Sequence, residues 1–327
     1  MTRYLTRRLL TGILLVFLAT TLAFMLASFT MQPRENYLSR NPPIPESSID
    51  QKLDEVNQND KTPVFQRYAT WISGVARGNF GLTTEGRSIN DEMGRRIGVT
   101  LRLLFVGSVV GAVFGVLLGV WGALRQYGYS DRIITVFSFF MLATPVFFTA
   151  VLLKYGALQL NQLTGRQLLY YTGETSVGLT GSAWTLFVDR IQHLILPTLA
   201  IALGEMALYS RYQRSAMLDV LGSDYLRTAQ AKGLTRRKTF YKHGLRTALI
   251  PMTIWFAFSF GLLIVGATFT EVIFSWPGMG AWFIDSVRKQ DINVAAATTL
   301  FTAVLVLFST FLADVFRAIL DPRVRTG

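Results

Sequence analysis

The polar stretch Ser223-Asp-Tyr-Leu-Arg-Thr-Ala-Gln-Ala-Lys-Gly233-Leu-Thr-Arg-Arg-Lys238 lies in a loop, residues 219–248, between two long apolar segments. Ser223 or Asp224 can cap a short first helix, because a side-chain oxygen there accepts a hydrogen bond from a free N–H group of the first turn. Gly233 is followed by a leucine and fits the left-handed position just past a helix C-terminus. The stretch therefore predicts two short helices joined at a glycine.

Helical spacing arranges the side chains of these two predicted helices. Tyr225, Leu226 and Ala229 share one face of the first helix. Thr235 can cap the second helix. The apolar residues of the second helix continue into the next apolar segment: Phe240, Tyr241, Leu245 and Ala248. A helical hairpin with a small-residue face is suited to contact another protein.

Apolar runs of about 20 residues, the length that crosses a bilayer as a helix, recur along the chain. Hydrophobic residues make up 51% of the sequence, and the mean hydropathy is positive. Six runs stand out: residues 9–31, 101–124, 133–153, 194–209, 249–269 and 294–313. The fourth is the weakest, because it is short and contains Pro197, Gly204 and Glu205. The expected fold is an all-α polytopic membrane protein with six transmembrane helices and a cytoplasmic helical hairpin.

The first apolar run follows three arginines, Arg3, Arg7 and Arg8, as in a secretory signal peptide. The run is too long for a signal peptide, and no Ala-x-Ala cleavage site follows it. We expect a retained membrane anchor.

The basic residues are concentrated in alternate loops. Residues 211–248 hold nine Lys and Arg against two Asp, whereas residues 32–100 hold nine basic and nine acidic residues. The positive-inside rule then places both termini in the cytoplasm, with 32–100 and 272–293 outside. The expected parts are a first span with its tail (1–31), an extracytoplasmic segment (32–100) and a five-helix core (101–327). The net charge of +12 reflects this topology and not nucleic-acid binding, for which no recognisable fold is present.

The segment 32–100 begins with a Pro-rich piece that we expect to be extended or irregular. Helical spacing then recurs at Phe65, Tyr68, Ala69, Ile72 and Ala76, with Trp71 alongside. This pattern predicts an amphipathic helix on the outer leaflet, with its aromatic rings at the headgroup level.

The second apolar run contains glycines at four-residue steps: Gly107, Gly111, Gly115 and Gly119. Small residues at this spacing let another helix approach closely, either as static packing or as a moving interface. Pro145, Pro197 and Pro251 can each bend a helix or lie in its first turn.

Three sequence signatures support a family resemblance. Six residues separate Trp71 from Gly78-Asn-Phe80-Gly81, Phe274-Ser-Trp276-Pro277-Gly278 lies between the last two runs, and the chain ends near Asp321-Pro-Arg-Val-Arg. Together with the hairpin, where Arg227-Thr228-Ala229 replaces the general Glu-Ala-Ala, they resemble the permease subunits of ABC importers for dipeptides and oligopeptides. The resemblance spans nearly the whole chain and implies the type I importer permease fold.

The resemblance also implies roles for residues of the hairpin and the outer loops. The residues that would couple to an ATPase are Asp224, Tyr225, Arg227, Thr228, Ala229, Ala231, Lys232 and Gly233. The residues of the extracytoplasmic loops or gate would be Trp71, Phe80, Gly81, Phe274, Trp276, Pro277 and Gly278. For the Pro-Gly loop, a tight turn with Phe274 and Trp276 as anchors at the outer interface is favoured over direct substrate contact.

The implied partners are a homologous second permease, two ATPase domains, an extracytoplasmic binding protein and membrane lipid. The location would be the bacterial plasma membrane. The chain itself would bind no cofactor and catalyse no reaction, with ATP and Mg on the partner ATPases. In agreement, it has no Walker-type phosphate loop.

Catalytic and redox chemistry have few residues to use. The chain has no cysteine and two histidines, His193 and His243, which the topology places on opposite sides of the membrane. Glu205 is the deepest acid in a predicted span and should face a partner or water. It could contact a substrate amine or a gate, pair with an arginine such as Arg211, or lie near the cytoplasmic surface.

Two other function classes have less support in the sequence. An intramembrane protease needs a catalytic pair at one depth, which the histidines do not supply. A channel needs filter-like or charged pore segments, and none is apparent. Within the importer class, nickel complexes, glutathione and some sugars are alternatives to peptides.

Overall fold

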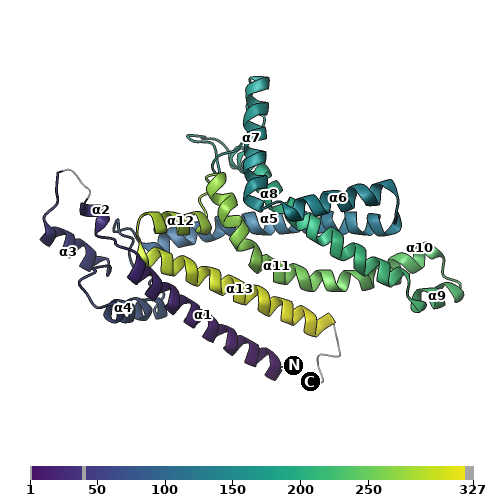
Figure 1. The fold of residues 1–327 in the computed structure, drawn as a ribbon, viewed down its shortest axis with the longest axis horizontal. Coiled ribbons are helices and arrows are strands. Elements are labelled where there is room, and N and C mark those ends of the chain that lie inside the picture. Colours follow the sequence, from purple (N-terminus) through teal and green to yellow (C-terminus); the bar gives the residue numbers. More distant parts are fainter. Residues whose placement is uncertain (1, 39–41, 321–327) are drawn as a thin grey trace. The chain divides into compact units, whose positions relative to one another are not determined.

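The computed structural model describes residues 2–38 and 42–320, and Figure 1 shows that these are mostly helical, with loops between the helices. The helices are α1 (Thr2–Thr30), α2 (Glu35–Leu38), α3 (Glu46–Glu55), α4 (Val64–Ala76), α5 (Ile89–Leu124), α6 (Tyr129–Ala143), α7 (Val146–Thr164), α8 (Ala183–Leu221), α9 (Asp224–Ala231), α10 (Arg236–Thr239), the π-helix η1 (Phe240–Leu245), α11 (Arg246–Ile273), α12 (Met279–Arg288) and α13 (Ile292–Leu320). The terminal Asp-Pro-Arg signature lies outside the described residues.

Five stretches of the described chain are long and apolar enough to cross a membrane: Leu5–Leu38, Ile89–Leu124, Ala183–Leu221, Arg236–Ile264 and Ile292–Arg317. The expected count of six is reached if α6 and α7 together form one span. The predicted third span, 133–153, is broken, because α6 and α7 meet at 105°, and Figure 1 shows α7 turning away from α6. Thr144 is extended, as expected before Pro145, whose ring disfavours the helical conformation there.

The predicted fourth span, expected to be short, is the 39-residue helix α8. Pro197 lies inside this helix, and Pro251 likewise lies inside α11. The polar residues that lowered the hydropathy of α8 are buried against the chain itself, among them Asp189, His193, Glu205 and Gln213. Hydropathy alone therefore understated the length of this helix.

The chain divides into two compact units. Unit 1 contains Arg102–Ser275 with the described parts of the two chain ends, and unit 2 contains Thr6–Leu101 and Trp276–Phe308. This is a grouping by contacts. The predicted parts 1–31, 32–100 and 101–327 were defined by the side of the membrane on which they lie, which contacts do not test, so that division stays a prediction.

In unit 1, the glycine ladder of α5 packs directly on α8. A β-carbon at Gly111 would lie 2.5 Å from Cβ of Glu205, and one at Gly115 would lie 2.5 Å from Cβ of Tyr209. At the two ends of the ladder, Gly107 faces Ile201 and Gly119 faces Gln213. The expected close approach of a second helix is confirmed, and the two helices run parallel because both residue numbers rise together.

In unit 2, the helix predicted within 32–100 forms as α4, but its environment differs from the prediction. Trp71 is 3% exposed and stacks on Phe24 of α1 with ring centroids 5.1 Å apart. Ile292 and Ala296 of α13 complete this cluster. The prediction of aromatic rings at the headgroup level is wrong for Trp71, because distant helices supply an apolar surface that covers it.

The piece before α4 is more ordered than expected. The prolines are followed by α3, whose Ile49 and Leu53 are buried together with Tyr37 of α2. Pro45 occupies the position before the first turn of α3, where a missing N–H costs nothing. Among its described residues the Pro-rich piece itself contains only the short α2, so the prediction of an extended or irregular piece holds for the rest of it.

Candidate functional site

The hairpin of residues 219–248 has the predicted form. The helix α9 ends at a glycine with a φ of 87°, Gly233. The N–H of Leu234 donates to the carbonyl of Ala229, and the N–H of Gly233 donates to that of Gln230. These two bonds form a Schellman motif, so the predicted left-handed position and its hydrophobic follower are confirmed.

The two predicted caps have different outcomes. The Thr235 side chain accepts a hydrogen bond from the N–H of Lys238, as predicted for the second helix. The Ser223 side chain instead donates to the carbonyl of Val220 at the end of α8, and α9 has no side-chain cap from Ser223. That part of the prediction is wrong, because the free carbonyls of α8 compete for the same hydroxyl.

The exposed residues of α9 form an open surface. Asp224 and Arg227 make an exposed ion pair of 3.5 Å. Leu226 is the buried residue of α9, and Ala229 is half-buried. The expected shared face therefore holds for these two residues but not for Tyr225, which is exposed. The other predicted coupling residues are exposed as well: Thr228, Ala231, Lys232 and Gly233.

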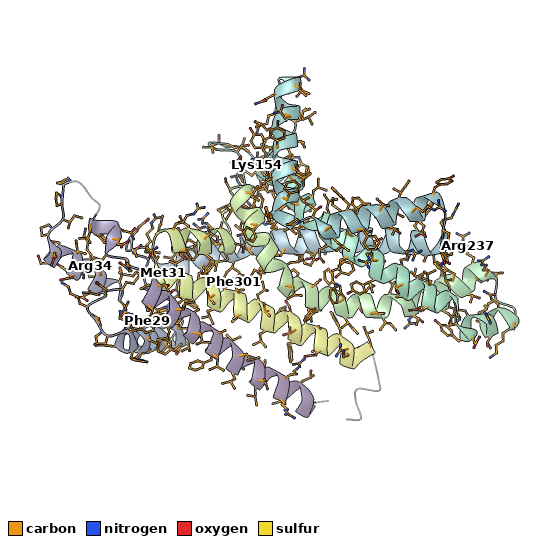
Figure 2. All side chains as sticks on the ribbon, viewed as in Figure 1. Phe29, Met31, Arg34, Lys154, Arg237 and Phe301 are labelled. Atoms are coloured by element: carbon orange, nitrogen blue, oxygen red, sulfur yellow. The ribbon has the colours of Figure 1, made fainter. Side chains whose placement is uncertain are left out.

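The second half of the hairpin is strongly basic. Arg236, Arg237 and Lys238 stand in α10, and all three are exposed. Figure 2 shows Arg237 at the end of the hairpin region, where α9 and α10 lie next to each other in Figure 1. Tyr241 is also exposed. It was expected to lead into the membrane segment with Phe240, Leu245 and Ala248, but it does not lie on the buried face.

In unit 2, the Asn79-Phe80-Gly81 signature forms a tight turn. The N–H of Phe80 donates to Oδ1 of Asn90 at 2.9 Å, and Gly81 has a φ of 89°. The Phe80 ring packs beside Ile89 and Met93 of α5. The turn therefore fixes the start of α5.

The Trp-Pro-Gly signature is a turn, as expected, but its aromatic residues are not interfacial anchors. Trp276 is buried, and its Nε1 donates to the carbonyl of Val99 at 3.5 Å. The N–H of Met279 donates to Oγ1 of Thr100 at 2.8 Å. Within unit 2 the turn is thus pinned to α5, with Pro277 half-buried and Gly278 buried.

Phe274, in unit 1, is also buried. It packs with Ala150 of α7 and with Leu196 and Ala200 of α8. Both aromatic residues were predicted to lie at the outer interface, and both fill protein interior instead.

Asp291 is a buried centre of unit 2 that the sequence reasoning did not identify. Its carboxylate accepts hydrogen bonds from Nε2 of Gln58 at 3.0 Å, the N–H of Thr84 at 2.7 Å and the N–H of Val294 at 3.1 Å. The adjacent Asn293 donates to the carbonyls of Val56 and Leu82. An aspartate directly before an apolar run is a helix N-cap signal, and it could have drawn attention to this position.

Glu205 lies in the middle of α8 and is buried. Its Oε2 atom has no hydrogen-bond partner among the described residues. Arg211, the partner weighed for it, lies over the ring of Phe139 at 4.4 Å and forms no ion pair with Glu205 in the described chain. Sixteen residues of α8 follow Glu205, about 24 Å of helix, and proximity of Glu205 to the cytoplasmic surface stays a prediction.

Clusters that could hold a metal ion are absent from residues 2–38 and 42–320.

Comparison with known proteins decides the family. The family of binding-protein-dependent transport system inner membrane components matches residues 115–326. The chain belongs to this family. The permease is 51% identical, over 327 residues and the whole of both chains, to the oligopeptide transport system permease protein OppB of Mycobacterium tuberculosis.

Two further relatives have similar names. The permease is 34% identical over 326 residues, 99% of each chain, to the oligopeptide transport system permease protein AppB of Bacillus subtilis. It is 31% identical over 276 residues to the dipeptide transport system permease protein DppB of Escherichia coli, which covers 80% of this chain and 81% of that one. The expected fold class, an all-α membrane permease of this family, is confirmed, and the chain is a transport subunit.

Proposed function

We propose that this permease is the membrane subunit of an ATP-driven importer that carries peptides across the bacterial plasma membrane. The observation that carries the proposal is the full-length match, at 51% identity, to a chain named as an oligopeptide transport permease. The dipeptide permease among the relatives supports peptides as the substrate class. Nickel complexes, glutathione and sugars are the alternatives that a transport assay must distinguish.

The hairpin is the proposed contact for the ATPase partners. Its exposed helix α9 is presented beyond the end of α8, and the following residues are basic. In this proposal ATP and Mg bind to two partner ATPase domains, and closure of those domains moves the hairpin. Alternating access then follows from helix movement in the permease and its homologous second subunit.

The proposed topology has both termini and the hairpin in the cytoplasm and 32–100 outside. The chain has no cysteine, so single cysteines can report the side of the membrane. Lys61 and Lys242 are exposed positions for such probes, whereas Asn59 is buried and unsuitable. Labelling of Lys61→Cys only from the cytoplasmic side would contradict the topology.

A reconstituted transport assay tests the function. The permease should copurify with ATPase subunits and a second permease, and proteoliposomes containing this complex should take up peptide only with ATP and the cognate binding protein. Dipeptides and longer peptides should compete for uptake, whereas glutathione, nickel complexes and sugars should not. A purified complex without ATPase activity would overturn the proposed class, an ATP-driven importer. Uptake inhibited by nickel complexes alone would overturn the proposed substrate, a peptide.

A further inference from the structure

Between residues 239 and 252, from α10 into the first turns of α11, the buried face changes phase at one point. The buried positions are Thr239, Gly244, Ala248 and Met252. The last three follow one another at four-residue steps, as in an α-helix, but the first step has five residues. That step coincides with the π-helix η1, whose wider turn contains one surplus residue. The π-helix therefore keeps α10 and α11 on the same buried face.

Gly244 is the residue that this phase change turns inward. A β-carbon there would lie 3.5 Å from Cε of Met217, 3.6 Å from Cδ1 of Leu226 and 3.7 Å from Cγ1 of Val220. Met217 and Val220 belong to α8, and Leu226 belongs to α9. Gly244 thus lines a shallow socket in which the last turns of α8 and the hairpin helix meet.

Leu226 is the side chain of α9 that fills the socket. It is 4% exposed and is the buried residue of that helix. The helix contacts η1 and α10, while its charged residues Asp224 and Arg227 are open to solvent. A force applied to the exposed side of α9 therefore reaches η1 through Leu226.

We propose that Leu226 and Gly244 are the positioning pair that transmits movement of the hairpin to α11. This inference rests on the proposed coupling of the hairpin to ATPase partners and adds the internal contact that the coupling requires. A β-carbon at Gly244 would meet Leu226 at an ordinary van der Waals distance of 3.6 Å, so Leu226 packs on η1 with room for no more than a small side chain between them, and displacement of α9 displaces η1 with it. The π-helix is a suitable recipient, because π-turns are less stable than α-turns and occur frequently at functional sites.

A size exchange between the two residues tests the pair. The variants are Leu226→Ala, which empties the socket, Gly244→Leu, which blocks it, and the double variant, which restores the summed side-chain volume to within one methyl group. Each is purified as the full complex with its ATPases and reconstituted in proteoliposomes. The readouts are the amount of bound ATPase, the ATP hydrolysis rate, and the peptide taken up per ATP hydrolysed.

Each single variant should keep its ATPase and continue to hydrolyse ATP, while peptide uptake per ATP falls about tenfold, within the usual range of coupling between sites. The double variant should recover most of the loss. Gly222→Leu is the matched control for added bulk, because Gly222 is exposed in the same hairpin region and lies outside the socket. Gly244→Ala is the conservative control, because its β-carbon meets only ordinary contacts.

The outcomes separate this inference from the function on which it rests. If the unaltered complex neither holds an ATPase nor imports peptide, the proposed function fails. If the unaltered complex works and both single variants transport normally, the pair transmits nothing and only the inference is overturned. Loss of bound ATPase in step with lost uptake, or a double variant no better than the single ones, would also overturn it, since the contact would then only support the hairpin.

Discussion

Arg214 of α8 and Asp131 of α6 form a two-point ion pair, with Nε to Oδ1 at 2.6 Å and Nη2 to Oδ2 at 2.8 Å. Asp131 is buried and also accepts the N–H of Tyr127 at 2.9 Å. A β-carbon at Gly122 of α5 would lie 3.2 Å from Oδ1 of Asp131. Three helices of unit 1 thus meet at one carboxylate.

We expect Asp131→Ala to destabilise the permease by about 2–4 kcal/mol, because removal of one partner leaves the other charge without compensation in a buried contact. Thermal unfolding of the purified protein in detergent measures the change. Arg214→Asp combined with Asp131→Arg is the charge-exchange control and should recover part of the loss. Equal stability of Asp131→Ala and the unaltered protein would mean that the pair contributes nothing to the packing of α6.

The glycine ladder should tolerate no side chain at its centre. Gly115→Leu should prevent close packing of α5 on α8, because even the first carbon would lie 2.5 Å from Cβ of Tyr209 and 2.7 Å from the carbonyl of Met206. Gly98 is the matched control, since it lies in the same helix with nothing within 4 Å. Gly98→Ala should be neutral or raise stability by about 0.5–1 kcal/mol through helix propensity. Yield of folded protein after detergent extraction gives the comparison.

Gly233 should be required for its backbone conformation and not for space. Its φ is 87°, and a β-carbon would meet nothing within 4 Å. Gly233→Val should therefore abolish peptide uptake, because a β-branched residue in this region costs more than the roughly 1–2 kcal/mol of an ordinary residue. Gly233→Asn should retain most uptake, since asparagine tolerates the left-handed region. If both variants transport equally well, the turn is not needed for coupling.

A change at the half-buried Ala229 should act differently. Ala229→Glu adds bulk and charge to a half-buried position, so we expect the ATPase to detach or its hydrolysis to become uncoupled from uptake. The membrane insertion of the permease should be unchanged. ATPase copurification and normal insertion, measured on the same sample, distinguish this result from general misfolding, and normal uptake would remove the hairpin from the coupling path.

The buried Asp291 should give unit 2 a characteristic pH dependence. Burial raises the pKa of Asp291 above its usual range, although the hydrogen bonds from Thr84, Val294 and Gln58 act in the opposite direction. A group whose pKa is raised by folding stabilises the folded state fully below its ordinary pKa, and this contribution is lost as the pH rises through the raised value. The stability of the unaltered protein relative to Asp291→Asn should therefore increase as the pH is lowered from 7.

The stability of the Asp291→Asn variant must be subtracted at each pH, because other carboxylates in unit 2 change the stability with the opposite sign. Lys61 and Arg34 hold the pKa of Asp50 below its usual range, so that contribution is lost as the pH falls. Both proteins retain Asp50, and its effect cancels in the difference. A pH-independent difference in unfolding free energy would show that Asp291 does not titrate in the range measured.

Glu205 has an unpartnered carboxylate oxygen among the described residues, in a helix where such a group is costly. If it contacts the amine of a peptide substrate, Glu205→Gln should lower uptake without lowering assembly, because the charge is lost and the shape is kept. The melting temperature of Glu205→Gln, measured in parallel, distinguishes substrate contact from a role in helix packing. A melting temperature that falls in proportion to uptake would assign Glu205 to helix packing alone.

The features that were predictable from the sequence are the local ones. The turn at Gly233 and Leu234 depends on neighbouring residues, and the ladder at Gly111 and Gly115 depends on one repeat within a single helix. Such patterns carry their structural meaning without knowledge of the partner.

The features that the sequence did not disclose depend on distant partners. A tryptophan suits both a membrane interface and a buried cluster, and nothing near Trp71 or Trp276 indicates that Phe24 and Val99 will cover them. The surplus residue of η1 was hidden for another reason, because a helical pattern read at a constant 3.6-residue period passes over a single five-residue step. The break at Pro145 needed a choice between a bent helix and a broken one, which the residue alone leaves open.

The hydrogen bonds around Asp291 impose an order on biogenesis. Gln58 and Asp291 are 233 residues apart in sequence, and Asn293 lies 237 residues from its acceptor Val56. A ribosome delivers the early half of these contacts long before the late half exists, and bonds between such distant residues form late in folding. With no cysteine in the chain, no disulfide can hold the early half in the meantime. The segment 32–100 is thus among the first parts of the permease to be synthesised and among the last to be fixed in place.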